Sequence, residues 1–222
     1  MSTNPTLRRN FLLGTPLVTA VVMLFHPSPY SDLVGELVPI ANWWMTIHTI
    51  QFILFALMGA AVWMLTDGLR GVAATVSRVA AVVFAIFYDI GDAVAGISTG
   101  ILARSAAGAP TGEQAAIVGA VETLFQSPVK NLVFAVGINA WAVALIAAAV
   151  ALFWAGAPRV PLFLLALPVY FMGFDHAFPF GSLTFASFFV AALWLEFAWP
   201  KRASKEGDSY VTVPPVSGPE VH

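Results

Sequence analysis

Residues 79–103 read VAAVVFAIFYDIGDAVAGISTGILA, and this stretch decides the fold class. It is apolar over more than the about 20 residues that a helix needs to cross a bilayer. It does not alternate apolar and polar residues as the strands of a membrane barrel do. Its two aspartates, Asp89 and Asp92, each cost about 2.5 to 3.5 kcal/mol at the centre of a membrane helix. We therefore expect a membrane helix that turns its acidic face into a helical bundle.

Five other apolar stretches flank this one, and the composition of the chain agrees with them. The 222 residues are 59% hydrophobic and 10% charged, whereas soluble domains carry charge at about a quarter of their positions. The sequence predicts an all-α polytopic integral membrane protein in which one domain, residues 1–199, contains six transmembrane helices. The predicted spans are about 10–27, 43–65, 79–103, 131–155, 160–176 and 182–199.

The distribution of Lys and Arg predicts the orientation, because cytoplasmic loops are enriched in both. With both termini in the cytoplasm, only Arg104 and Lys130 lie outside. The expected location is the plasma membrane, or the inner membrane of a cell with two. The tail, residues 200–222, lacks an apolar period and is predicted to be disordered and cytoplasmic. The cations placed inside are Arg8, Arg9, Arg70, Arg78, Arg159, Lys201, Arg202 and Lys205.

The longest connection, residues 104–130, is predicted to carry an amphipathic helix over about 111–126 on the outer surface. Thr111 and Gln114 have the spacing of a capping box, and the apolar residues after them recur at helical spacing. An interfacial anchor is favoured over a lid, because such surface helices commonly bind the membrane interface.

Polar residues from three of the spans are predicted to share one layer near the outer surface. The rise of 1.5 Å per residue in a helix places His48 at a depth of about 7 Å, Asp92 at about 10 Å, and Gln51 and Asn139 at about 12 Å, with Asp89 near the midplane. Asp89, Asp92 and Gly96 fall on one helical face. Gly96 and Gly100 form a GxxxG pattern that lets another backbone approach closely.

The candidate catalytic residues are His48, Asp92 and Asp89. In this hypothesis His48 acts as base or hydrogen-bond donor, Asp92 orients its imidazole, and Asp89 is a second, protonatable acid. A core histidine satisfied by a backbone carbonyl is an equally weighted interpretation of His48. The candidate ligand-binding residues are Gln51, Asn139, His26, Asp175 and His176. His26 and His176, taken singly, are more typical of helix-end residues than of ligands.

A metal or haem site is considered and not predicted. Three histidines with Asp92 or Asp175 offer nitrogen and oxygen donors, but no H-x-x-x-H or H-x-x-E-H supplies two ligands from one helix. We therefore expect no bound metal, haem or other cofactor. The chain contains no cysteine, which excludes disulfides, thiolate metal sites and cysteine nucleophiles. It also lacks a glycine-rich phosphate loop and a G-x-S-x-G motif.

The leading functional hypothesis is an outward-facing intramembrane pocket that binds a small or lipophilic molecule and transforms it by acid–base chemistry. The alternative is a proton- or solute-coupled transporter, or its substrate-binding subunit, although the two halves show no inverted repeat. A third is a membrane scaffold without a ligand. The sequence leaves open whether the protein is an enzyme. The expected partners are membrane lipids and the pocket ligand, and homo-oligomers remain open. A net charge of -2 without a basic stripe indicates no nucleic-acid partner.

Overall fold

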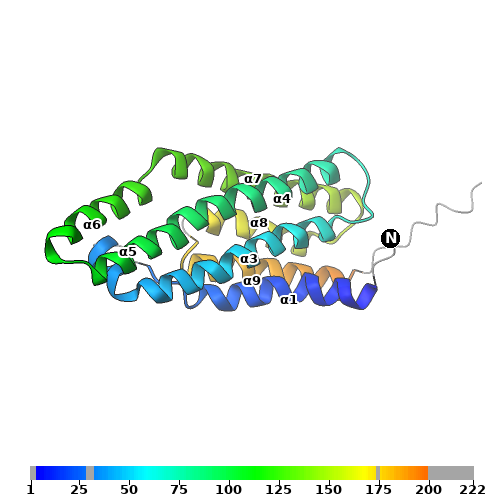
Figure 1. Cartoon of the computed structure of the whole chain (residues 1–222). Helices are drawn as coiled ribbons and strands as arrows, with labels where there is room; N and C mark the ends of the chain where they lie inside the picture. The colour runs from blue at the N-terminus through cyan, green and yellow to red at the C-terminus, as the bar shows by residue number, and fades with distance from the viewer. Residues whose placement is uncertain (1–3, 29–32, 174–175, 200–222) are drawn as a thin grey trace, which may run out of the picture.

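A computed structural model of the chain describes residues 4–28, 33–173 and 176–199, and every regular element in these ranges is helical. Figure 1 shows an elongated bundle in which the long helices run alongside one another and α6 extends from one end. The elements are α1 (Pro5–Met23), α2 (Leu33–Leu37), the 3-10 helix η1 (Val38–Ile40), α3 (Ala41–Leu65), α4 (Val72–Asp92), the π-helix η2 (Ala93–Ser98), α5 (Thr99–Gly108), α6 (Thr111–Phe125), α7 (Pro128–Trp154), α8 (Arg159–Met172) and α9 (Phe180–Phe197).

Glycines form the tight turns that return the chain through the bundle. Gly71, just before α4, has a φ of 104°, and Gly156, just after α7, has a φ of 84°. Residues with a Cβ rarely adopt such backbone angles. The short connections from α3 to α4 and from α7 to α8 therefore bring successive helices together.

Small residues set the spacing between α3, α4 and α7. A Cβ added to Gly59 of α3 would lie 2.9 Å from the carbonyl oxygen of Ala81 in α4. A Cβ added to Gly137 of α7 would lie 2.8 Å from the backbone nitrogen of Tyr88 in α4. Glycine at these points lets the backbones approach closely, as is typical of helices packed within membranes.

Aromatic side chains from α3, α4, α7 and α9 fill the bundle interior, toward the end at which the amino terminus of the chain lies. Phe84 and Trp141 have ring centroids 4.7 Å apart, and Phe55 lies 5.8 Å from Phe185. All four side chains are fully buried. Near the start of α1, Arg8 forms an ion pair of 2.8 Å with Glu196 of α9. This part of the bundle is a packed core.

Four helical runs among the described residues are long and apolar enough to cross a membrane, which suggests membrane integration. They are Gly35–Leu65, Val72–Gly108, Thr111–Trp154 and Phe180–Phe197, and α8 is a shorter apolar helix. The helix around the predicted span 79–103 is longer than expected, because α4, η2 and α5 are continuous. The outward faces carry large apolar side chains, such as Leu132 and Phe163, each 65% exposed, as lipid contact requires. The predicted tail, residues 200–222, lies outside the described residues.

Candidate functional site

Three histidines from separate parts of the chain converge at the end of the bundle opposite the amino terminus. His26 follows α1, His48 lies in the second turn of α3, and His176 lies between α8 and α9. One ring nitrogen from each lies within 4.8 Å of the other two. The Nε2 atoms of His26 and His48 are 3.3 Å apart. His26 and His48 are buried, and His176 is half-buried. The two histidines that looked like isolated helix ends in the sequence therefore belong to one cluster with His48.

The His48 ring is held by the backbone of its own helix. Its Nδ1 lies 2.7 Å from the carbonyl oxygen of Trp44, one turn earlier in α3. A carbonyl oxygen can only accept a hydrogen bond, so Nδ1 carries the proton and donates it. The lone pair is then on Nε2, which is the nitrogen that faces His26. The indole of Trp44 packs on the imidazole, with ring centroids 4.3 Å apart.

Asp92 lies beside this nitrogen. Its Oδ1 is 3.9 Å from His48 Nε2, which is too long for a hydrogen bond. The side chain is completely buried, and neither of its oxygens has a hydrogen-bond partner among the described residues. The sequence predicted that Asp92 orients the imidazole. In the structure the Trp44 carbonyl holds the ring, and Asp92 faces the nitrogen that carries the lone pair.

Gly96 allows the close approach between His48 and the helix that carries Asp92. Asp92 is the last residue of α4, and the chain continues as the π-helix η2, an element that is frequent at functional sites. A Cβ on Gly96 would overlap the His48 side chain, and one on Gly100 would overlap Met45. The atoms nearest to both glycines thus belong to side chains of α3 and not to its backbone. The contact at Gly96 positions His48 against η2.

His176 is positioned by α9 and α7. A Cβ on Gly181, in the first turn of α9, would overlap the carbonyl group of His176, so glycine lets the connecting segment pack against the helix. On the other side, the ring of Phe134 in α7 stacks with the imidazole at an interplanar angle of 23°. These contacts bring His176 within 4.8 Å, ring centroid to centroid, of His26.

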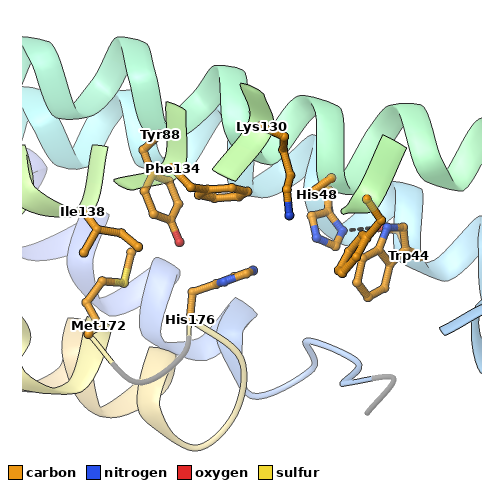
Figure 2. A pocket seen from close by; sticks show the side chains of 11 residues that line it. Trp44, His48, Tyr88, Lys130, Phe134, Ile138, Met172 and His176 are labelled. Carbon is orange, nitrogen blue, oxygen red and sulfur yellow. Dashed lines mark hydrogen bonds between the residues drawn. The ribbon is translucent and has the colours of Figure 1, made fainter. Parts of the chain in front are cut away.

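A cavity of about 250 Å³ adjoins the cluster. His48 and His176 line it together with Lys130, and its apolar wall includes Phe134, Ile138 and Met172. Figure 2 shows the ammonium group of Lys130 and the hydroxyl of Tyr88 pointing into the space above His176. Lys130 Nζ lies 4.6 Å from the ring centroid of Phe125. The cavity thus has a polar end at the histidines and an apolar end toward Met172.

The other residues predicted for the site lie away from this cavity. Gln51 is fully buried and donates a hydrogen bond of 2.9 Å to the sulfur of Met23. Asp89 is buried but does not line the cavity. Asn139 is exposed and donates to the carbonyl of Ala135 in its own helix at 2.7 Å. Asn139 therefore does not join the cluster: its depth is appropriate, but it faces outward. Asp175 lies outside the described residues.

Lys130 is the site residue that the sequence reasoning missed. From the sequence it is only one of the two outer cations, yet Lys130, Phe134 and Ile138 recur every four residues and so share one face of α7. That spacing of a cation, an aromatic ring and an aliphatic side chain could have identified the amphipathic wall.

The comparisons with known proteins do not identify the chain. No family model matches it, and no curated protein or solved structure shows significant similarity. The functional proposal therefore rests on the geometry of the site.

Proposed function

We propose that this protein is a six-span membrane protein that holds a small amphiphilic molecule in the cavity beside His48 and His176. In this proposal both termini are cytoplasmic, so the cavity opens toward the outer face. The excess of Lys and Arg that this orientation places inside supports it. The observation that carries the proposal is the cavity itself, which joins two imidazoles and an ammonium group to a wall of aromatic and aliphatic side chains.

The ligand's polar group is expected to be an anion, because Lys130 supplies a cation that no acid among the described residues compensates. Lys130 is only partly exposed, and no described carboxylate lies within ion-pair distance of it. Its ammonium group instead lies near the faces of Phe125 and Phe134, at 4.6 and 5.6 Å from the ring centroids. A carboxylate or phosphate in the cavity would gain a charge-assisted hydrogen bond from Lys130.

The ligand's apolar part would lie against Phe134, Ile138 and Met172. Pockets that bind small molecules are commonly apolar with a few polar groups that fix the orientation, and this cavity has that composition. Its volume of about 250 Å³ limits the enclosed part to a short chain or a single ring. A longer tail would extend from the bundle into the surrounding lipid.

The chemistry proposed for the site is proton transfer. His48 Nε2 carries a lone pair that can accept a proton from a ligand bound in the cavity. The imidazolium formed would lie 3.9 Å from Asp92 Oδ1, whose negative charge would stabilise it. Asp89, one helical turn before Asp92, does not line the cavity and would serve as the second acid only through Asp92.

Transport and a scaffold role remain the alternatives. No described feature favours transport, because the aromatic core at Phe55, Phe84 and Trp141 fills the interior beyond the cavity. A scaffold without a ligand would leave the buried carboxylate of Asp92 without a hydrogen-bond partner among the described residues, which is a costly arrangement. Binding therefore agrees best with the geometry.

Photolabelling tests the proposed ligand class. Proteoliposomes containing the full chain would be irradiated with a short fatty acid that carries a diazirine, and with the amine of the same chain length. We expect the acid to label the cavity wall at Phe134, Ile138 or Met172, and the amine not to do so. Lys130→Gln should reduce labelling about tenfold, the effect of losing about 1.4 kcal/mol of a charge-assisted contact.

Arg104→Gln is the matched control for this experiment, because Arg104 is the other cation predicted outside and does not line this cavity. It should label like the unaltered protein. Equal labelling by the acid and the amine, or labelling that does not change in Lys130→Gln, would contradict the proposal of an anionic ligand.

A further inference from the structure

We infer that His26, His48 and His176 bind a divalent transition-metal ion, with zinc as the best fit and Asp92 as the fourth ligand. Imidazole nitrogens and a carboxylate oxygen are donors that zinc commonly takes in proteins. This inference goes beyond the proposed function, because it concerns the histidine cluster and does not require that the cavity hold an amphiphile. With the metal bound, the lone pair of His48 Nε2 is a metal ligand, so His48 acts as a base only in the metal-free protein.

The distances within the cluster are close to those of a tetrahedral metal site. Zinc binds imidazole nitrogen at 2.0–2.1 Å, so neighbouring ligand atoms in a tetrahedron are about 3.4 Å apart. The Nε2 atoms of His26 and His48 are 3.3 Å apart, which matches one edge of such a tetrahedron. Asp92 Oδ1 lies 3.9 Å from His48 Nε2, about half an ångström wider than a second edge.

His176 is the ligand that must move to close the site. The ring centroids of His48 and His176 are 6.5 Å apart, against 4.9 Å for His26 and His48. The ligand nitrogens of the three histidines lie within 4.8 Å of one another, so bringing them to the tetrahedral edge requires a shift of up to about 1.4 Å. His176 lies in the connection between α8 and α9 rather than inside a helix, where such an adjustment deforms no helical hydrogen bonds.

The hydrogen bond of His48 prepares the ring for metal binding. Ligating histidines usually donate their second ring N–H to a carbonyl or carboxylate, which fixes the tautomer and the direction of the lone pair. His48 has this arrangement, since Nδ1 donates to the Trp44 carbonyl at 2.7 Å. Nε2 is thereby left as the donor atom that faces His26.

Asp92 is an independent observation that points to a bound cation. Its carboxylate is completely buried, and both oxygens lack a hydrogen-bond partner among the described residues. Buried carboxylates are stable when they are paired or coordinate a metal. A divalent ion between Asp92 and the three imidazoles would supply the missing partner and would offset the negative charge.

The sequence argument against a metal does not apply to this arrangement. It relied on the lack of two ligands at helical spacing in one helix. Here His26, His48, Asp92 and His176 come from four separate segments, and packing brings them together. A metal bound by these four residues would lie beside the cavity that Lys130 lines. An anion in that cavity would then face both the metal ion and the ammonium group of Lys130.

Metal analysis of the intact protein tests the inference. The full chain would be expressed with added zinc, purified with a tag that contains no histidine, and analysed by mass spectrometry of the elements. We expect stoichiometric zinc in the unaltered protein, and a loss of about tenfold or more in His48→Ala, His176→Ala and Asp92→Asn. His222→Ala is the matched control, because the chain has 4 histidines and His222 is the one beyond the described residues, whereas the other three form the cluster. It should retain the metal.

Cobalt binding keeps the test decisive if the ligand variants fail to fold. Chelated, folded, unaltered protein titrated with Co²⁺ should develop the strong visible absorption of a tetrahedral cobalt site, and zinc should remove it. An unaltered protein that neither contains zinc nor binds cobalt, or a loss of metal in His222→Ala equal to that in His48→Ala, would overturn the inference. The proposed ligand class is tested separately, by photolabelling the chelated protein with the diazirine acid. If the acid still labels the cavity wall, only the metal inference has failed.

Discussion

Gly96→Ala is the substitution that most directly tests how His48 is positioned. The added methyl group would point from η2 into α3. An ideal Cβ at this position would lie 2.5 Å from the Cβ of His48 and closer still to two ring carbons. Rotation of the imidazole moves the ring carbons but leaves the His48 Cβ in place. The two helices must therefore separate locally, by roughly 1 Å to reach an ordinary carbon contact of about 3.5 Å.

The expected change in stability has two parts of opposite sign. Forcing an extra methyl group into a packed interface costs about 1–3 kcal/mol, whereas alanine is favoured over glycine within a helix by about 1 kcal/mol. Gly119→Ala in α6 should show only the gain from replacing glycine with alanine in a helix, because a Cβ there meets nothing within 4 Å. The difference in unfolding free energy between the two variants should therefore be about 1–3 kcal/mol, with Gly96→Ala the less stable.

The assay is unfolding of each variant in mixed micelles by increasing fractions of a denaturing detergent, followed by helical circular dichroism. Zinc content is measured on the same preparations. Gly96→Ala should lose metal even where it remains folded, because the shift moves His48 Nε2 away from His26 and Asp92. If Gly96→Ala is as stable as Gly119→Ala and also retains the metal, the contact between η2 and His48 does not position the site.

Two further predictions concern the other end of the bundle and its orientation. Arg8 and Glu196 form an ion pair of 2.8 Å, and their side chains are 18% and 13% exposed. A double-mutant cycle of Arg8→Gln, Glu196→Gln and the double variant should give a coupling energy of about 1 kcal/mol in the same unfolding assay. Additive effects would show that the pair contributes nothing to stability. A cysteine introduced at the exposed Ala107 should react with an impermeant maleimide in intact cells, with the cysteine-free parent chain as the blank. Labelling only after lysis would place the histidine cluster at the cytoplasmic side.

Much of the helical architecture could be predicted from hydropathy. Apolar stretches of this length must be buried in protein or surrounded by lipid, and few folds other than a helical bundle allow this. The acidic face of α4 could also be predicted: Asp89 and Asp92 are both buried, as the cost of a carboxylate facing lipid requires. The close approach at Gly96 follows from the same face. These features depend on local spacing within one helix, which a sequence displays directly.

The assembly of the site could not be predicted in the same way, because it depends on how each helix is rotated relative to its neighbours. Depth along a helix comes from counting residues, and it placed Asn139 near His48; rotation about the helix axis turns Asn139 outward instead. His26 and His176 lie 150 positions apart in the chain, and no spacing rule relates them. In the sequence Lys130 resembles a solvated end of a span, and only the rotation of α7 places it beside the cavity.

The π-helix η2 also bears on how this chain could change by insertion and deletion. A wide turn of this kind accommodates a residue more than an α-helix of the same length, and each residue of an α-helix turns the chain by about 100°. Deleting one residue within Ala93–Ser98 would remove that extra residue and restore regular winding, while α5 kept its rotation relative to α4. Gly100 would then stay against Met45, and Asp92 would keep its place. A single codon could thus be lost from η2 with α5 and α6 still in place beside the histidine site, whereas the same loss inside α4 would rotate every residue after it by about 100°.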